Sequence, residues 1–311
     1  MRVRGAVIGL MFVALAQGAS AQDLRTPWGA PDLQGVWSNM TITPLERPSV
    51  FSDLAVTDEQ AAEFERTSNA IFAAATIDGV GGRQSEWWED SPQMMRIDGR
   101  VRTSIIVEPA NGRIPVSDAG KAQVAQLMAD NLDLFDDPES RPATERCLVG
   151  GSGSTGAPFF AARYNNNYRF VQTPDHLVIA MEMGEVRIIP ISNEAPPPFR
   201  RWMGHSRGRW EGETLVVETR GFVSGDSFKL SRPLFISPDA LVVERYTRLS
   251  ETQLLYDFTV DDPVAYTQTW RGQHVFDISA QREFEYACHE DNHSLINILQ
   301  GGRVRDAAAR Q

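Results

Sequence analysis

The sequence predicts a mainly β protein with a few helices, whose strands form an antiparallel meander curved into a barrel-like or half-closed sheet. From residue 164 onward, short segments alternate apolar and polar side chains with the period of two that is typical of half-buried strands. Turn signals such as Gly184 and Gly212 separate these segments at hairpin spacing, which favours a closed or half-closed sheet. The expected strands are residues 168–173, 177–183, 185–191, 207–211, 214–219, 241–249, 253–260 and 264–276.

We expect a single β-rich domain over residues 22–311, whose first part, residues 22–145, mixes strands with helices. Thr57 and Ser117 precede two helical patterns and are good N-caps, because a hydroxyl there accepts a backbone N–H. The elements expected in this part are helices 58–75 and 118–130 and strands 36–42 and 101–108.

A third helix is expected near the C-terminus, over residues 292–299. Gly301 and Gly302 follow it and are typical of a helix end. The tail, residues 303–311, should therefore fray.

The N-terminus has the pattern of a secretory leader. Arg2 and Arg4 precede an apolar run over residues 6–16, and the small residues Ala-Ser-Ala end at Ala21. The run is shorter than the roughly 18–20 apolar residues of a membrane helix. We therefore expect a signal peptide over residues 1–21, cut after Ala21, and a periplasmic or secreted protein.

The charge is acidic, with 30 basic and 41 acidic residues and a net charge of −11. Without the two leader arginines, 28 basic residues against 41 acidic ones leave −13. Such a surface repels phosphate backbones and anionic lipids, so we expect neither nucleic-acid binding nor peripheral membrane docking. No later segment reaches the roughly 18–20 apolar residues of a membrane helix, so we expect no membrane insertion. The expected partner is a small-molecule ligand or substrate, with no cofactor; the oligomeric state is left open.

The two cysteines of the chain are Cys147 and Cys288. In an exported protein such a pair is expected to form one disulfide, and two buried thiols are the alternative. No C-x-x-C is present, which disfavours a thiol-redox role.

Two short motifs resemble catalytic signatures but stand in the wrong context. G-x-S-x-G places Ser206 where a hydrolase nucleophile would be, yet prolines precede it and a hairpin follows, instead of a strand and a helix. H-E-x-x-H spans His289 to His293, but no third histidine follows. We expect no nucleophile and no metal site here, and the second motif is interpreted as a helix N-terminus capped by Asn292. His289 and Glu290 could still serve a site without metal.

Two further groups are candidates for a polar site. The amides of Asn165, Asn166 and Asn167, between Tyr164 and Tyr168, can turn the backbone or bind a polar ligand. Glu182 and Arg187 flank the Gly184 turn; they form either a cross-strand ion pair or, if buried, a candidate acid/base pair.

Long motifs along the chain are TPWGAPDLQGVWSN (26–39), TPLERP (43–48), RTSIIVEPANGRIP (102–115), ERC (145–147), YNNNY (164–168), EMGEVRIIPI (182–191), RWMGHSRGRWEGETLVVET (201–219), VERYTRL, YDFTVDDP and YACHEDN. With these motifs the chain resembles a large group of exported bacterial proteins that has no established reaction. The group usually carries Asp at the position of His205 and Tyr at that of His293, so both short motifs above look accidental. The G-x-W at residues 35–37 is similar to the first strand of lipocalin-like barrels. The first resemblance implies that the candidate group-level positions are Asn165, Asn166, Asn167, Glu182, Arg187, Arg207, His289 and Glu290.

Three functions are compatible with the sequence. The first is binding of a small, largely apolar molecule in a barrel-like cavity. The second is a cofactor-independent hydrolase, lyase or isomerase with His289 or Glu182 as the base and Arg187 or Arg207 stabilising an anion. The third is a structural or interaction protein of the cell envelope. A cavity with a buried ionisable pair would favour the enzyme, and a solid core the structural protein. The side chains expected to line or fill the barrel are Met181, Met183, Trp210, Tyr256, Phe258 and Trp270.

A disulfide between the cysteines would bring His289 back toward the segment of residues 164–168. Sequence-adjacent strands usually pair, which would place Glu182 and Arg187 nearby. The sequence therefore predicts that these groups share one pocket.

Overall fold

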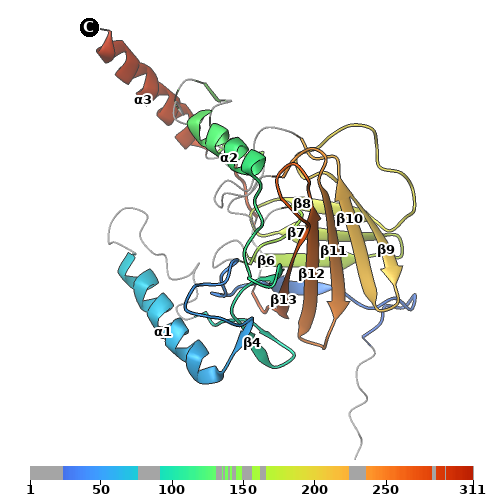
Figure 1. Cartoon of the computed structure of the whole chain (residues 1–311). Coiled ribbons are helices and arrows are strands. Elements are labelled where there is room, and N and C mark those ends of the chain that lie inside the picture. The colour runs from blue at the N-terminus through green and yellow to red at the C-terminus, as the bar shows by residue number, and fades with distance from the viewer. Residues whose placement is uncertain are drawn as a thin grey trace, which may run out of the picture.

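The computed structural model describes residues 24–75, 92–130, 135, 137–138, 141, 145–148, 156–161, 166–223, 236–281, 285–290 and 292–310, so the expected leader lies outside the described residues. Nine strands form a nearly closed, barrel-shaped antiparallel sheet (Figure 1), which confirms the predicted mainly β, barrel-like fold. In pairing order the strands are β8 (Val186–Pro190), β7 (His176–Met181), β6 (Asn167–Gln172), β1 (Gly35–Ser38), β13 (Trp270–Ile278), β12 (Gln253–Asp261), β11 (Leu241–Arg248), β10 (Thr214–Arg220) and β9 (His205–Glu211).

The sheet curves until its two end strands, β8 and β9, meet. In Figure 1, β6, β7 and β8 run across the direction of β9 to β13. The ends join through a parallel bridge between Ile191 and Gly208, where the Ser192 N–H donates to the Gly208 carbonyl at 3.1 Å. A Cβ on Gly208 would lie 3.5 Å from Ile189 Cγ2 and 3.5 Å from Ile191 Cγ1, which is ordinary van der Waals contact between the two sheet ends. Within the described residues no other ladder pair joins β8 to β9, and we call this open line the seam.

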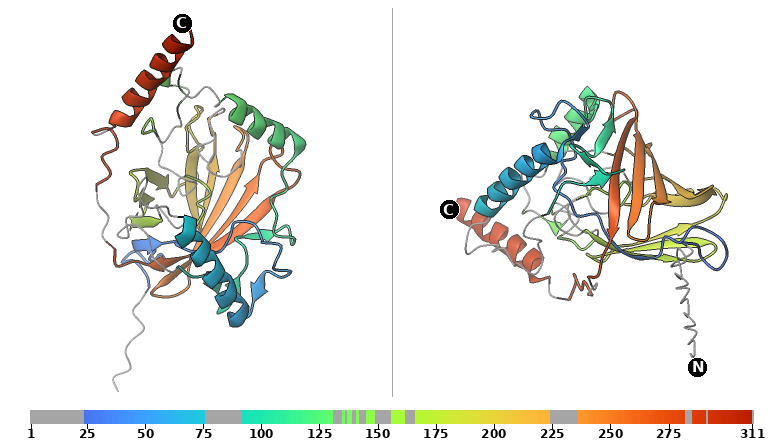
Figure 2. Two further views of the ribbon diagram at one scale, coloured as in Figure 1. Left: turned by 90° about the vertical axis from the view of Figure 1, so that its left-hand side faces the viewer. Right: turned by 90° about the horizontal axis from the view of Figure 1, so that it is seen from below.

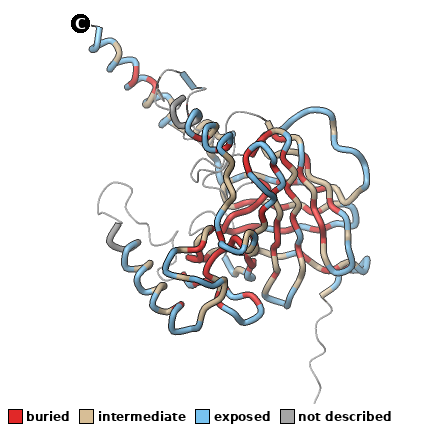
Figure 3. Tube along the Cα trace, in the orientation of Figure 1, coloured by how far each residue is buried: buried red, intermediate tan, exposed pale blue. Residues whose placement is uncertain are grey.

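Aromatic side chains fill the interior of the barrel. The ring of Phe159 lies 5.1 Å from that of Tyr168, 5.9 Å from Tyr256 and 6.3 Å from Phe276, and all four residues are fully buried. Such pairs contribute about 0.5–1.5 kcal/mol each beyond their buried area. The buried stretches of the chain gather in the barrel, as Figure 3 shows. Of the side chains expected to line or fill it, the buried ones are Met181, Tyr256, Phe258 and Trp270.

Residues 55–75 and 92–102 form a smaller unit of a three-stranded sheet and a helix. Its strands pair in the order β2 (Ala55–Val56), β4 (Arg100–Arg102) and β3 (Arg96–Ile97). Helix α1 (Asp58–Ala75) has the predicted bounds. Its predicted cap is confirmed: Thr57 Oγ1 accepts the Gln60 N–H at 3.4 Å, and Gln60 Oε1 accepts the Thr57 N–H at 3.1 Å.

Three expected strands are shorter in the structure. The strand expected over residues 36–42 is β1, which ends at Ser38. Residues 101–108 divide into β4 and β5 (Ile106–Glu108), because the Ser104 hydroxyl bonds to the Ile106 carbonyl and the chain crosses from the small sheet to β13. Strand β13 begins only at Trp270, because the carboxylate of Asp262 accepts the N–H groups of Val264 and Ala265 and holds a turn there.

Helix α2 (Asp118–Asp130) has its predicted bounds, and Ser117 Oγ accepts the Gly120 N–H at 2.9 Å. Helix α3 (His293–Ala309) does not end at Gly301 and Gly302, so the predicted stop and the frayed tail are wrong. Gly302 packs on Phe135 so closely that a Cβ would lie 2.6 Å from Phe135 Cβ, and the arginines and alanines that follow have high helix propensity. The helix carries the C-terminus away from the barrel (Figure 2).

Candidate functional site

A groove of about 680 Å³ opens at the seam. One wall is β8, whose outward side chains Val186 and Ile188 are 50% and 63% exposed. The other wall is formed by residues 197–207, which lead from a proline-rich segment into β9. We call it the seam groove, and it is lined by Leu148, Val186, Arg187, Ile188, Pro190, Pro197, Arg200, Arg201, Trp202, Met203, Gly204, His205, Ser206, Arg207 and Val223.

Arg187 is the most buried charge of the groove lining. It is 4% exposed and pairs with Glu244, which is 0% exposed: Nη2 lies 2.7 Å from Oε2 and Nη1 lies 3.0 Å from Oε1. Tyr246 and Tyr256 donate their hydroxyls to the same Oε1 at 3.0 and 2.7 Å. The Glu244 carboxylate is therefore hydrogen-bonded on both oxygens inside an aromatic core. The guanidinium of Arg187 also lies 4.9 Å from the centre of the Phe159 ring.

The pKa values of these groups follow from burial and from the shared carboxylate. Burial opposes the charge of the guanidinium, but the ion pair with Glu244 outweighs burial and raises the pKa of Arg187 above its ordinary value. Burial and the negative charge of Glu244 raise the pKa values of Tyr246 and Tyr256 well above 10, so both phenols remain hydrogen-bond donors at neutral pH.

Arg187 also connects the two sides of the seam. From β8 its Nη2 donates to Ser206 Oγ on β9 at 3.0 Å, and Ser206 Oγ lies 2.9 Å from Thr219 Oγ1 on β10. Its Nε is buried and has no hydrogen-bond partner within the described residues. One side chain thus links the otherwise unpaired strand edges at the base of the groove.

The other arginines of the groove lie nearer its surface. Arg207 donates to two backbone carbonyls, those of Glu194 at 3.3 Å and of Ser206 at 3.1 Å. The Arg201 guanidinium lies 5.3 Å from the centre of the Phe199 ring. Arg200 pairs with Asp239 at 3.4 Å, and half of its side chain is exposed.

The predicted cross-strand pair of Glu182 and Arg187 is wrong. In the β7–β8 ladder Arg187 is opposite Ile179, and Glu182 lies beyond the last residue of β7. Arg187 points into the core, where Glu244 is its partner. The alternative of a buried Glu182–Arg187 pair is therefore wrong as well: Arg187 does pair with a buried carboxylate, but that carboxylate is Glu244.

Glu182 instead organises the amides that precede β6. Its Oε2 accepts the backbone N–H groups of Asn166 at 3.0 Å and Asn167 at 3.2 Å, and the side-chain amide of Asn167 at 3.2 Å. Tyr168 is fully buried in the aromatic core. The amide oxygen of Asn166 accepts the Ser38 hydroxyl at 3.1 Å, and the Asn167 amide donates to Gln281 at 2.9 Å. Tyr164 and Asn165 lie outside the described residues.

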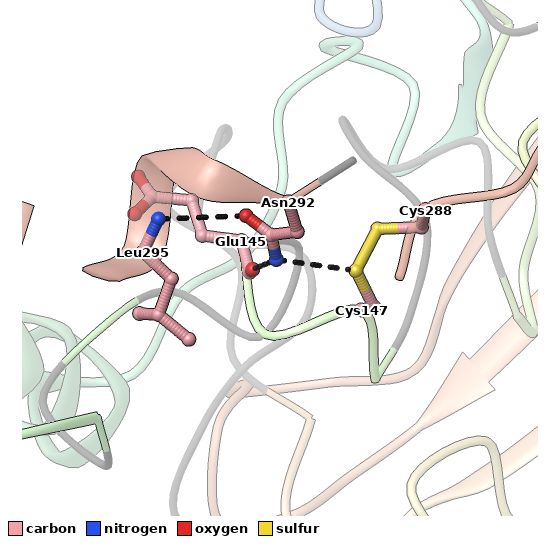
Figure 4. Close-up of a disulfide and its surroundings, with 5 residues drawn as sticks. All are labelled: Glu145, Cys147, Cys288, Asn292 and Leu295. Carbon is pink, nitrogen blue, oxygen red and sulfur yellow. Dashed lines mark hydrogen bonds between the residues drawn. A yellow bond between two sulfur atoms is a disulfide. The ribbon is translucent and has the colours of Figure 1, made fainter. Parts of the chain in front are cut away.

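The predicted disulfide between Cys147 and Cys288 is present, with the Cα atoms 5.8 Å apart. Asn292 caps α3, as expected: its Oδ1 accepts the Leu295 N–H at 3.4 Å (Figure 4). The amide nitrogen of Asn292 donates to the Glu145 carbonyl at 2.6 Å, which holds the start of α3 against the cysteine turn.

A second hollow of about 350 Å³ surrounds this disulfide, and His289 and Glu290 line it. Glu185 lines it too, and burial raises the pKa of its carboxyl to about 7. The predicted site residues are thus divided: Arg187 and Arg207 line the seam groove, His289 and Glu290 the hollow at the disulfide, and Glu182 holds the amides.

The two short motifs lack their catalytic geometry. Ser206 is inside β9, a regular strand, so no strand–turn–helix elbow forms. His289 and Glu290 precede α3, while His293 is its first residue, so the two histidines do not share a helical face. No cluster of three or more potential metal ligands occurs within the described residues, and the absence of zinc stays a prediction.

Sequence reasoning missed Glu244 and its two tyrosines. Val242, Glu244 and Tyr246 alternate with outward residues on β11 and are all buried. A lone carboxylate at an inward position of an apolar strand face is therefore the signal that would have found the partner of Arg187.

The protein is thus a nearly closed antiparallel barrel that carries a basic, partly apolar groove along its seam. No known family model, curated protein sequence or solved structure matches the chain. No helix within the described residues has the length and apolar character needed to cross a membrane.

Proposed function

We propose that this protein is exported and binds a small, largely apolar molecule in the seam groove. The observation that carries this proposal is the groove itself, a hollow of about 680 Å³ at the seam between β8 and β9. Ligand pockets typically have volumes of about 300–1,000 Å³ and combine apolar walls with a few polar groups. The site belongs at the seam because aromatic side chains fill the barrel interior.

Exposed apolar side chains on β8 support this proposal. Val186 and Ile188 occupy outward positions, where a strand facing water usually carries polar residues. Pro190 and Trp202 extend the apolar surface along the groove. A bound apolar molecule would remove this surface from water, at about 25 cal/mol for each Å² covered.

Export is proposed from the leader pattern and is supported by the disulfide, since disulfides persist in oxidising compartments. Membership of the exported bacterial group is proposed on the motifs given above. The acidic net charge of −11 supports a small-molecule partner over a nucleic acid.

The buried ion pair at the base of the groove supports binding more than catalysis. Glu244 does not line the groove and already accepts hydrogen bonds from Arg187, Tyr246 and Tyr256, so it is not positioned to exchange a proton with a ligand. His289 and Glu182, the proposed bases, do not line the groove either. The filled barrel core is also expected of a structural protein. The groove favours a binding protein, because a purely structural role does not need one.

Titration with the uncharged fluorescent dye N-phenyl-1-naphthylamine tests the proposal. Wild-type protein should enhance its emission in a saturable manner. Val186→Asn together with Ile188→Asn should weaken binding about tenfold, because two apolar contacts are lost.

The matched control is Val171→Asn together with Val264→Asn, two residues that are 43% and 45% exposed and lie outside the groove. It should bind the dye like the wild type. Absence of wild-type binding, or an equal loss in both variants, would overturn the proposed function.

A further inference from the structure

We infer that the ligand of the seam groove is an apolar carboxylic acid, whose head group is held by Arg201 and Arg207 while its apolar body lies against β8. This inference rests on the proposed function and adds the chemical class of the ligand.

The first argument is the charge of the groove. Among the described residues, its lining includes Arg187, Arg200, Arg201 and Arg207 but no Asp or Glu. The whole chain has the opposite balance, 41 acidic against 30 basic residues. A concave site that concentrates positive charge in an acidic protein selects an anion and repels a cation.

The second argument is that two of these arginines lack a carboxylate partner. Arg187 has Glu244, and Arg200 has Asp239. Arg207 contacts only backbone carbonyls, and Arg201 only an aromatic ring, so neither forms an ion pair within the described residues. A guanidinium fork matches a carboxylate, and two forks that line the same groove provide enough donors for both of its oxygens.

The third argument is that the groove offers charged and apolar surface side by side. Arg201 and Arg207 belong to the wall of residues 197–207, whereas Val186, Ile188 and Pro190 form the opposite wall. Ser206 adds a hydroxyl at the base, fixed by Arg187. A molecule with one acidic end and an apolar body can satisfy both walls at once.

Three ligands of equal shape and different charge test this inference: 2-naphthoate, 2-naphthylmethanol and 2-naphthylmethylammonium. Their dissociation constants are measured at pH 7 by displacement of the uncharged dye. We expect the acid to bind about tenfold more tightly than the alcohol, because charge-assisted hydrogen bonds form only with the carboxylate. The ammonium should bind more weakly than the alcohol, and added salt should reduce the preference.

The double variant Arg201→Gln/Arg207→Gln should lower the ratio of acid to alcohol affinity to about one. Arg209→Gln is the matched control: it removes an arginine of the same strand, which is paired with Glu218 and Glu211 and is not part of the groove lining. It should leave the ratio unchanged, and thermal melting checks that each variant is folded.

The outcomes separate the two proposals. If all three ligands bind equally and the β8 variant weakens them, the groove binds apolar molecules and the inferred acid is wrong. If the Arg209 control loses the preference as well, general surface charge explains it and the inference is overturned. If neither the dye nor any of the three ligands binds, the proposed function itself fails.

Discussion

Arg187 links the two edges of an incomplete barrel and supplies the counter-charge of a fully buried carboxylate. Its contacts with Glu244 on β11 and Ser206 on β9 join β8, at one end of the sheet order, to strands at or near the other end. A charge at this depth is tolerable only because it is paired and hydrogen-bonded. Removing one partner therefore costs more than the net contribution of the pair.

Arg187→Met should lower the free energy of unfolding by about 3–5 kcal/mol, because Glu244 is left as an unpaired buried charge. Arg187→Met combined with Glu244→Gln should recover much of this loss. Both are measured by urea denaturation at pH 7. Arg209→Met is the control, an exposed arginine whose ion pairs are worth less than about 1 kcal/mol. Equal losses in Arg187→Met and the control would contradict the assigned role.

His274 should make stability depend on pH. It is fully buried, and burial lowers its pKa to about 4 from an ordinary value of 6.5. Between these values the unfolded chain binds a proton that the native protein does not, so stability falls as the pH falls from about 6.5 toward 4. Over this pH range the neutral, buried His274 should account for a loss of about 3 kcal/mol in the free energy of unfolding.

The test compares denaturation curves of the wild type and His274→Gln between pH 4 and 7.5. Glu185 acts in the opposite direction, because its raised pKa of about 7 makes the native protein bind the extra proton, so stability rises as the pH falls from about 7 toward 4.5. Since Glu185 is present in both proteins, the difference between the curves isolates His274. Parallel curves would show that His274 titrates normally.

At the scale of elements, α3 continues through two adjacent glycines, Gly301 and Gly302, which have different surroundings. A Cβ on Gly301 would meet nothing within 4 Å, while one on Gly302 would lie 2.6 Å from Phe135 Cβ. The first glycine only weakens the helix, and the second allows it to pack.

Gly301→Ala should stabilise α3 by up to about 1 kcal/mol, and Gly302→Ala should loosen it through the clash with Phe135. Amide hydrogen exchange in α3 provides the measurement, with slower exchange expected in the first variant and faster exchange in the second. Slower exchange in both would show that Phe135 does not constrain the helix.

At the scale of the whole molecule, the disulfide joins Cys147, which precedes β6, to Cys288, which precedes α3. The bond closes a loop with a sequence separation of 141, which contains eight of the nine barrel strands. In the chain-entropy model such a loop stabilises the folded state by about 4–5 kcal/mol.

Reduction should lower the free energy of unfolding by up to about 5 kcal/mol, measured by denaturation with and without a reductant. Thiol titration of the denatured, unreduced protein should find no free thiol. The variant Cys147→Ala/Cys288→Ala should match the reduced protein and ignore the reductant. Two titratable thiols, or a wild-type curve insensitive to reductant, would contradict the prediction.

The sequence by itself determined the local features of this protein. Alternation predicted the strands from β6 to β12 closely, and hydroxyl caps predicted the starts of α1 and α2, because these signals depend on neighbours within a few residues. The disulfide was also predictable, since the chain has just two cysteines. The end of α3 was not, because the packing of Gly302 on Phe135 overrides the local stop signal.

Only the tertiary structure decided which distant groups meet. The sequence suggested Glu182 as the partner of Arg187 because only a turn separates them, but strand register places Arg187 opposite Ile179 and turns it toward Glu244. Register and the curvature that brings β9 beside β8 are properties of the closed sheet as a whole. For the same reason the seam groove, built from strands at opposite ends of the sheet order, has no signature in either segment alone.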